Sequence, residues 1–342
     1  MNITQLSTYL SEHKHPDFRR KQIIKGIVQD GCATYAEITT IPRALQEELL
    51  RNVPILPFTV VKIHASQDGR AIKALLQLTE GKHMIETVLI SPKPQMWSAC
   101  ISSQVGCAMG CAFCATGKLG LVRNLTTDEI TSQVLLWRQY LKQHNIIDTF
   151  ANIVYMGMGE PFMNWKNVKE SIDILTDKDL FGFANRGLSI STSGIVSGIM
   201  DFADTCPQIN LAISLHFVSD AKRTKYMPVN NGYDLSQLRH ALQYYLSKNK
   251  RKIFIEYIML KGINDTPEDA RLLAQYVASI GHMQLLHINL IRYNAIGENF
   301  SPSERETVKK FQSIMQKAHI PCTIRKSVGD DISGACGQLA GK

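Results

Sequence analysis

Residues 106–114 read Gly-Cys-Ala-Met-Gly-Cys-Ala-Phe-Cys and place Cys107, Cys111 and Cys114 in a C-x3-C-x2-C array. The array follows an apolar stretch that predicts a strand. Soft thiolate ligands select zinc, copper(I) or iron–sulfur, and a loop this short can wrap three sulfurs around one compact core. Structural zinc sites nearly always have four protein ligands, whereas a [4Fe–4S] cube held by three cysteines keeps one iron free. The spacing therefore favours a cluster with an open iron.

Other uses of these cysteines stay open at this point. A zinc site completed by a distant His or Cys is one, although no C-x2-C or H-x3-H pair occurs elsewhere in the chain. A chance cluster of buried thiols is another. A disulfide framework is disfavoured, because eight cysteines in 342 residues is ordinary for a chain long enough to bury its own core.

The composition is that of a folded enzyme, with 44% hydrophobic and 20% charged residues. No apolar run reaches the roughly 18 residues that a membrane span needs, so we expect no membrane insertion. The first residues lack the basic-then-apolar pattern of a signal peptide. We therefore expect a cytoplasmic protein, in a compartment where thiols stay reduced.

The formal net charge of +8 favours a polyanionic partner, because clustered cations displace counterions from a phosphate backbone. By itself this is weak evidence. Five cations gather on one early segment: Lys14, Arg19, Arg20, Lys21 and Lys25. This segment is a candidate contact for nucleic acid.

Three parts follow one another along the chain. Residues 1–55 carry helical periodicity and the basic segment, and we expect a small helical module that contacts nucleic acid. Residues 56–95 change to alternation of period two, with turn signals at 67–69 and 80–82, and predict short antiparallel strands that lead into the core. Residues 96–342 form the main domain and end in a segment that carries Cys336.

In the main domain, apolar strand-like runs alternate with amphipathic helices, which is the pattern of βα units. The expected strands are 97–102, 153–156, 188–192, 209–215, 253–259, 286–291 and 322–325. About six βα units fit, whereas a closed eight-fold barrel takes about 250 residues. The fold class is therefore α/β, with a partial, open parallel barrel.

Helix starts are marked by local signals. Thr126 and Glu129 form a capping box, and Thr266-Pro267 places proline at the first helical position. Ser301-Pro302, followed by Glu304, combines both signals and predicts a further start.

Polar and glycine-rich motifs follow several of the predicted strands. Met156-Gly-Met-Gly-Glu160 follows the second strand, Ser191–Gly194 the third, Ser214-Leu215-His216 the fourth and Asn294 the sixth. Parallel barrels hold their sites at this edge, so we expect these residues to meet the cysteine loop there.

Five motifs, in order along nearly the whole chain, carry a resemblance to a known family. They are Ile101-Ser-Ser-Gln-Val-Gly-Cys107, Arg123-Asn-Leu-Thr126, Met156-Gly-Met-Gly-Glu-Pro161, Asn210-Leu-Ala-Ile-Ser-Leu-His216 and Gly329-Asp-Asp-Ile-Ser-Gly-Ala-Cys336. The cysteine loop resembles that of radical S-adenosylmethionine (SAM) enzymes, and the whole set resembles the RlmN/Cfr family of RNA adenine methyltransferases.

The resemblance implies a [4Fe–4S] cluster on Cys107, Cys111 and Cys114, with SAM as second cofactor. It implies that one SAM methylates Cys336 and that a second SAM, split by an electron from the cluster, generates a radical that takes hydrogen from this S-methyl group. Cys100 would then release the product, leaving a transient disulfide with Cys336, and Glu86 would accept the ring proton. Read without the resemblance, Glu86 is an exposed strand carboxylate.

The resemblance also implies the residues that contact SAM and the partners of the protein. The SAM contacts are Gly159, Glu160, Ser191, Ser214, Leu215, His216 and Asn294. Residues 114–121 resemble Cfr, whereas Glu160-Pro-Phe, Ser191–Val196 and the Asp330 region resemble RlmN. We expect C2 methylation of an adenosine in 23S rRNA, with tRNA as a further substrate and C8 methylation as the alternative.

A monomer served by an electron donor such as flavodoxin or ferredoxin is expected. Two other classes stay open at lower weight. One is a radical SAM enzyme with a non-RNA substrate, and the other is a non-enzymatic metal- or RNA-binding protein.

Overall fold

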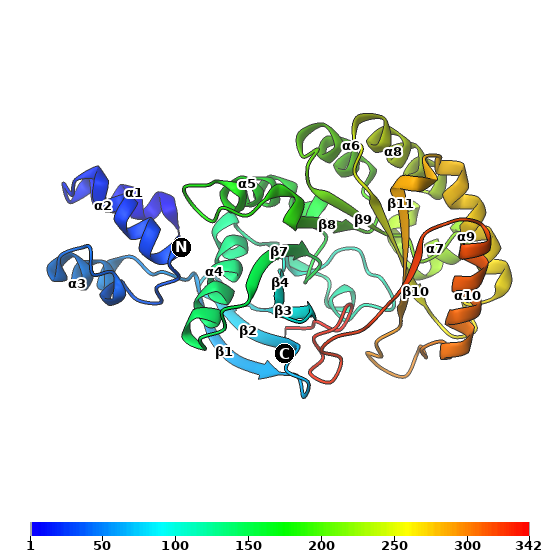
Figure 1. Ribbon diagram of the computed structural model, residues 1–342, viewed down its shortest axis with the longest axis horizontal. Helices are drawn as coiled ribbons and strands as arrows, with labels where there is room; N and C mark the ends of the chain where they lie inside the picture. Colours follow the sequence, from blue (N-terminus) through cyan, green and yellow to red (C-terminus); the bar gives the residue numbers. More distant parts are fainter. Residues whose placement is uncertain (1, 342) are drawn as a thin grey trace.

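Parallel strands form the centre of the protein, whose computed structural model describes residues 2–341. The order is β4-β7-β8-β9-β10-β11-β12, and each neighbouring pair is parallel. Helices cover the outer face of this sheet (Figure 1). The strand bounds are Met96–Cys100 (β4), Thr149–Tyr155 (β7), Leu188–Thr192 (β8), Asn210–Ser214 (β9), Ile253–Met259 (β10), Leu286–Arg292 (β11) and Cys322–Arg325 (β12). The helix bounds are Thr127–Gln143 (α4), Trp165–Thr176 (α5), Val196–Thr205 (α6), Asp220–Tyr226 (α7), Leu235–Lys248 (α8), Pro267–Ile280 (α9) and Arg305–Lys317 (α10).

The barrel stays open, as the sequence predicts. Within residues 2–341, β12 pairs with β11 alone, and the outer side of β4 pairs with β3 rather than with β12. Helices alternate with the parallel strands from β4 to β12 and make six βα units. The predicted α/β class and the partial parallel barrel are confirmed.

The antiparallel segment extends the same sheet. Strands β1 (Phe58–Ala65), β2 (Ala71–Leu78) and β3 (Met84–Lys93) pair in sequence, and β3 pairs antiparallel with β4. Ten strands therefore form one continuous sheet. Strand β1 forms its exposed edge.

The N-terminal helices lie at one end of the molecule (Figure 1). They are α1 (Ile3–Glu12), α2 (Asp17–Ile24), which continues as a π-helical turn at Lys25–Gln29, and α3 (Arg43–Asn52). The side chains of Arg138 and Gln139, both on α4, donate to the backbone carbonyls of Val28 and Cys32 and join this end to the barrel. The predicted segments 1–55, 56–95 and 96–342 contain the expected kinds of element, while their division into domains stays a prediction; residues 1 and 342 lie outside the described range.

Local helix signals are confirmed at two starts and wrong at a third. The capping boxes at Thr126 and Thr266 both form. The segment Ser301-Pro302 does not begin a helix, because Pro302 forms a bridge with Leu260 and Ser303 Oγ donates to Asp265 Oδ2 at 2.7 Å. Helix α10 begins only at Arg305, so tertiary contacts override the local signal here.

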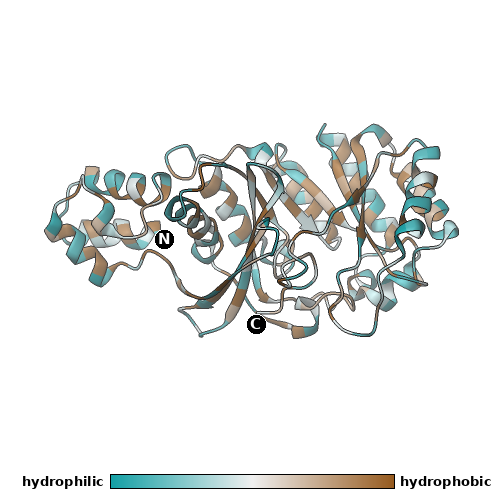
Figure 2. Cartoon of the chain, turned by 60° about the horizontal axis from the view of Figure 1, so that its bottom comes forward, coloured by the Kyte–Doolittle hydropathy of each residue, from teal (hydrophilic) through white to brown (hydrophobic). Residues whose placement is uncertain are grey.

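The core lies between the sheet and its helices. Six of the seven residues of β10 are buried, as expected for a parallel strand covered on both faces. Apolar residues concentrate on the strands and on the helix faces turned toward them, with hydrophilic residues on the outer turns (Figure 2). Among residues 2–341, no helix combines the length and the apolar character that crossing a membrane requires.

A small hairpin sets the start of the cysteine loop. Strand β5 (Gln104–Gly106) pairs with β6 (Leu121–Asn124), and Cys107 N donates to Gly120 O at 2.8 Å. Gly106 has a φ of +74°, and a Cβ there would lie 1.9 Å from Gly120 O. Only glycine lets the two backbone segments, at residues 106 and 120, approach this closely.

We expect Gly106→Ala to lower the free energy of unfolding by about 4 kcal/mol or more, because the new methyl group meets backbone that cannot move aside. Gly69→Ala is the matched control, since Gly69 has a φ of +67° but open space around its Cβ position. That variant should lose about 1–2 kcal/mol, the cost of the left-handed conformation alone. Urea denaturation followed by circular dichroism measures both, and equal losses would contradict this account.

Candidate active site

A cavity of about 480 Å³ opens at the carboxyl ends of the parallel strands. Its volume is in the range of small-molecule sites. Two of the predicted site residues, Glu86 and Leu215, do not line it. The others all do: Cys100, Cys107, Cys111, Cys114, Gly159, Glu160, Ser191, Ser214, His216, Asn294 and Cys336.

Three separate segments of the chain hold the cysteine loop through backbone hydrogen bonds. Cys107 N donates to Gly120 O, Ala112 N donates to Tyr226 O at 2.9 Å, and Ala115 N donates to Gly337 O at 2.8 Å. Burial raises the pKa of the Cys107 thiol to about 12 and that of Cys111 as well. Three neighbouring thiolates in this setting require compensating positive charge, which metal ions supply.

The three thiols of this loop share one cavity. Cys107, Cys111 and Cys114 all line it, as the ligands of one metal centre would. Three protein ligands suit a [4Fe–4S] cluster with one open iron, whereas a structural zinc site nearly always has four.

Two glycines let the loop after β7 pass close to the rest of the site. A Cβ on Gly157 would lie 2.7 Å from the backbone of Ile101. Gly159 has a φ of +104°, and a Cβ there would lie 2.6 Å from the Gln104 side chain. The loop can therefore turn directly into Glu160.

Glu160 is a buried carboxylate on the cavity wall. Its Oε2 accepts hydrogen bonds from Ser193 N and Oγ, at 2.7 and 2.8 Å, and its Oε1 accepts one from Phe162 N. Burial raises the pKa of Glu160, and these hydrogen bonds act in the opposite direction. A carboxylate with hydrogen-bond donors but without a cationic partner in residues 2–341 fits a cationic group on a ligand, such as the amino group of SAM.

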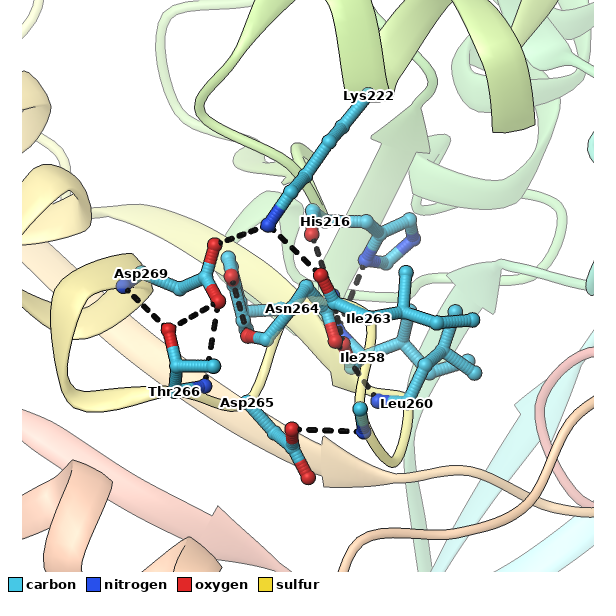
Figure 3. Close-up of polar contacts among 11 residues, drawn as sticks. His216, Lys222, Ile258, Leu260, Ile263, Asn264, Asp265, Thr266 and Asp269 are labelled. Atoms are coloured by element: carbon cyan, nitrogen blue, oxygen red, sulfur yellow. Dashed lines mark hydrogen bonds and ion pairs between the residues drawn. The ribbon is translucent and has the colours of Figure 1, made fainter.

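His216 is fixed in an unusual backbone conformation, with a φ of +56°. Its Nδ1 accepts a hydrogen bond from Ile258 N at 3.1 Å, and its carbonyl accepts one from Asn264 Nδ2 at 2.8 Å (Figure 3). Burial, with a smaller contribution from Arg223, lowers the pKa of His216 to about 3. The ring is therefore neutral, and because Nδ1 is an acceptor, Nε2 carries the proton and can donate.

Asn264 and Phe113 support this histidine from two sides. The side-chain amide of Asn264 donates to the carbonyls of His216 and Ile258 and accepts from Leu260 N (Figure 3). One amide therefore links the backbone at His216 to the end of β10. Phe113, between two of the cysteines, packs edge-on against the His216 ring with centroids 5.1 Å apart. Leu215 is buried beneath the cavity, and its backbone N–H donates to Glu256 O.

The remaining predicted cofactor contacts lie on neighbouring strand ends. The hydroxyls of Ser191 and Ser214 are 3.4 Å apart. Asn294 Oδ1 accepts from Ser327 Oγ at 2.7 Å, and its Nδ2 donates to Cys336 O at 3.2 Å. Asn294 therefore joins this edge of the cavity to the segment that carries Cys336.

Cys100 and Cys336 face the same cavity from distant parts of the sequence. Cys100 ends strand β4, and Cys336 is exposed on the C-terminal segment. Burial raises the pKa of the Cys100 thiol to about 12, negative charge on Cys336 acts in the same direction, and Arg325 acts against both. Both thiols are free, and no disulfide is present among residues 2–341.

Glu86 is buried rather than exposed, which corrects the reading of this residue from its strand pattern alone. Its Oε1 pairs with Lys73 Nζ at 2.8 Å. Its Oε2 accepts from Ala340 N and Gly341 N, at 2.7 and 3.0 Å. The carboxylate therefore anchors the end of the C-terminal segment just outside the cavity.

Sequence reasoning missed an ion pair on the cavity wall. Arg325, on β12, pairs with Glu256 Oε2 on β10 at 3.5 Å, and Asn289 Nδ2 on β11 donates to Glu256 Oε1 at 2.9 Å. The sequence carried one signal, because Glu256 interrupts the otherwise apolar run of β10, whereas Arg325 is the last residue of β12. Charges at such positions face either solvent or a site.

Comparison with known proteins agrees with this geometry. The family model described as the radical SAM superfamily matches residues 101–274. "Ribosomal RNA large subunit methyltransferase Cfr" of Lachnoclostridium phytofermentans is 38% identical over 100% of this chain and 99% of its own length. "Probable dual-specificity RNA methyltransferase RlmN" of Enterococcus faecalis is 37% identical over 99% of this chain and 94% of its own length.

Among solved structures, a radical SAM methyltransferase from Sphaerobacter thermophilus matches with a TM-score of 0.92 and 35% identity, covering 100% of this chain and 98% of that one. The match includes the N-terminal helices and the antiparallel strands as well as the barrel, since it spans the full chain. The chain belongs to the radical SAM superfamily and, within it, to the RlmN/Cfr family.

Proposed function

We propose that this protein methylates a ring carbon of an adenosine in RNA, with C2 of an adenosine in 23S rRNA as the main target and tRNA as a second substrate. One observation carries the proposal: Cys100 and Cys336 line the same cavity as the three cysteines of the metal loop. A radical SAM enzyme without a covalent methyl carrier has no need of this second pair. The names of the full-length relatives, which specify ribosomal RNA and RNA methylation, support the same substrate class.

The residues of the cavity divide into those that hold cofactors and those that act on the substrate. Cys107, Cys111 and Cys114 would hold the [4Fe–4S] cluster. When bound, the cluster and SAM supply the electron, the methyl group and the radical chemistry that an unreactive aromatic C–H bond requires. Glu160 would bind the cationic amino group of SAM. The Nε2–H of His216, held in a fixed position, would donate to a hydrogen-bond acceptor on SAM.

Cys336 is suited to carry the methyl group. Its side chain is exposed to the cavity, and its backbone is tied to Asn294 and, through Gly337, to Ala115 in the metal loop. As a thiolate, its sulfur would attack the methyl carbon of SAM, whose bond to the sulfonium breaks with S-adenosylhomocysteine as the leaving group. After a SAM-derived radical has removed one hydrogen from this methyl group, its carbon would bond to the RNA base. The substrate base would be unstacked to reach it.

Cys100 is suited to release the product. Its thiolate would attack the sulfur of Cys336, forming a disulfide, while the bond from that sulfur to the substrate carbon breaks and its electron pair stays on the carbon, which then takes a proton. Reduction of the transient disulfide would regenerate both thiols. This step fits a cytoplasmic protein, where thiol reductants are present.

We assign RNA contact to residues 1–55. Phe18 is 53% exposed on α2, and the guanidinium of Arg19 lies 4.7 Å from its ring centroid. Lys21 and Lys25 are exposed on the same helical stretch. Exposed cations beside an aromatic ring suit an RNA backbone and an unstacked base. We further propose a monomer that receives electrons from a flavodoxin or ferredoxin.

The main test is the product itself. Reconstituted protein, incubated anaerobically with 23S rRNA, SAM and a low-potential reductant, should yield 2-methyladenosine when the digested RNA is analysed by mass spectrometry. 8-Methyladenosine would instead assign the C8 alternative, which the Cfr-like residues 114–121 favour. A Cys336→Ala control should give neither. Absence of both products from cluster-loaded native protein would contradict the proposal and favour a non-RNA substrate.

Cys100→Ala should trap the enzyme on its substrate, because no thiol remains to break the bond between Cys336 and the RNA. We expect a covalent protein–RNA adduct that survives a denaturing gel and maps to Cys336 by mass spectrometry. Cys322→Ala is the matched control, since Cys322 is a free, partly buried thiol outside the cavity lining. Recovery of only free RNA and free protein from Cys100→Ala would reject the role of Cys100.

Glu86→Gln tests whether this anchoring carboxylate is also needed for proton transfer. Loss of the pair with Lys73 should lower the free energy of unfolding by roughly 3 kcal/mol, and Glu129→Gln, which removes the partner of Arg123 at 2.8 Å, should lose somewhat less. Only Glu86→Gln should also stop methylation, because Gln can accept the amide hydrogen bonds but cannot take a ring proton. If both variants methylate RNA at similar rates, Glu86 is an anchor alone.

A further inference from the structure

Arg223 is a fully buried cation beneath the floor of the cavity. It lies on α7 and has an exposed fraction of 0%. Its Nη1 donates to Asn230 Oδ1 at 3.0 Å, its Nη2 donates to Ser193 O at 2.5 Å, and its Nε donates to Leu215 O at 3.4 Å. Every one of these acceptors is electrically neutral.

No carboxylate of residues 2–341 pairs directly with this guanidinium. Asp220, the acid nearest along the helix, is exposed and bonds to Asn230 instead, at 3.0 Å. An uncompensated charge in a protein interior costs several kcal/mol, and buried arginines are almost always paired. Asp220 acts on Arg223 only through Asn230 and at longer range, which leaves the guanidinium without a direct anionic contact from the described residues and favours an anion close to it.

The cysteine loop, residues 107–114, lies next to helix α7. An anion bound by this loop would therefore be near Arg223. Tyr226, at the end of α7, accepts the hydrogen bond from Ala112 N between two of the cysteines. A Cβ on Gly110 would lie 3.7 Å from Pro228, so the turn after α7 packs against the loop. Ser193, which accepts from Arg223, also lines the cavity.

We propose that Arg223 is the buried counter-charge of the [4Fe–4S] cluster and raises its reduction potential. This inference rests on the cluster that the proposed function requires. Reduction adds one negative charge to a site that already holds three thiolates. A fixed cation nearby stabilises the reduced form more than the oxidised form, and low polarity makes the effect larger than it would be in water.

A purely structural role is the competing explanation. The guanidinium links the ends of β8 and β9 through Ser193 and Leu215, and this link alone could justify its burial. The two explanations differ in what they require: a link depends on the geometry of the guanidinium, whereas a counter-charge depends on positive charge. Variants that change one without the other separate them.

The experiment is an electron paramagnetic resonance titration of the reduction midpoint in full-length, cluster-loaded protein, without RNA. Arg223→Gln should move the midpoint to a more negative potential, and Arg223→Lys should stay close to the native value. Asn230→Asp, which leaves Arg223 in place but pairs it with a carboxylate, should move the midpoint in the same direction as Arg223→Gln. If Arg223→Gln does not fold, Asn230→Asp still tests whether the charge of Arg223 affects the midpoint potential.

Arg138→Gln is the matched control. Arg138 also donates to backbone carbonyls, but it lies on α4 beside the N-terminal helices and packs against the rings of Phe181 and Phe183. Its loss should leave the midpoint unchanged. An unchanged midpoint in both Arg223→Gln and Asn230→Asp, or equal shifts in Arg223→Gln and Arg223→Lys, would overturn the proposal. Since no RNA is present, failure of RNA methylation would leave this result unaffected.

Discussion

The attachment of the C-terminal segment across the mouth of the barrel is the constraint on which the site depends. Lys73 Nζ donates to Ser333 O at 3.3 Å and pairs with Glu86, whose other oxygen accepts two backbone N–H groups at the chain end. Thr116, just after the cysteine loop, donates to Leu339 O at 2.6 Å. Without these contacts, Cys336 would belong to a free tail. With them, it is held on the cavity that the metal loop lines.

This attachment explains why the antiparallel strands belong to the active site. Strands β2 and β3 carry Lys73 and Glu86 and extend the parallel sheet past β4. Figure 1 shows the C-terminal segment running toward these strands. A closed barrel would have no free edge at β4 to which they could pair. The open barrel is therefore what allows a second segment to bring Cys336 to the cavity that the three cysteines of residues 107–114 line.

Much of this could be predicted from the sequence, because the signals were local. The run Ile253–Met259 is apolar at nearly every position and became β10 with the predicted bounds. The starts at Thr126 and Pro267 could be predicted because a capping box and a proline at the first helical position are signals within one turn of the chain. The edge of the sheet at which the motifs meet followed from strand order alone, since parallel strands end on one side.

The rest could not be predicted, because it depends on contacts between distant residues. Glu86 reads as an exposed residue of a strand until Lys73 and the chain end, about 250 positions later, cover it. Ser301-Pro302 reads as a helix start until Leu260 pairs with it. Arg223 is a common residue on a polar helix, and only its depth in the fold shows that its charge is unpaired.

Two buried charged residues, Glu160 on the cavity wall and Arg223 beneath it, have opposite signs and no ionic partner in the described part of the chain. This argues that two ligands of opposite charge bind here. Glu160 is a carboxylate with no cationic partner among residues 2–341, while Arg223 is a cation with no carboxylate partner there. They do not neutralise each other, because Ser193 lies between them: its N–H and hydroxyl donate to Glu160, and its carbonyl accepts from Arg223. A protein that kept both charges buried without ligands would lose stability twice. A cationic cosubstrate on one side of Ser193 and an anionic cluster on the other would satisfy both, which makes the site complete only when both cofactors are bound.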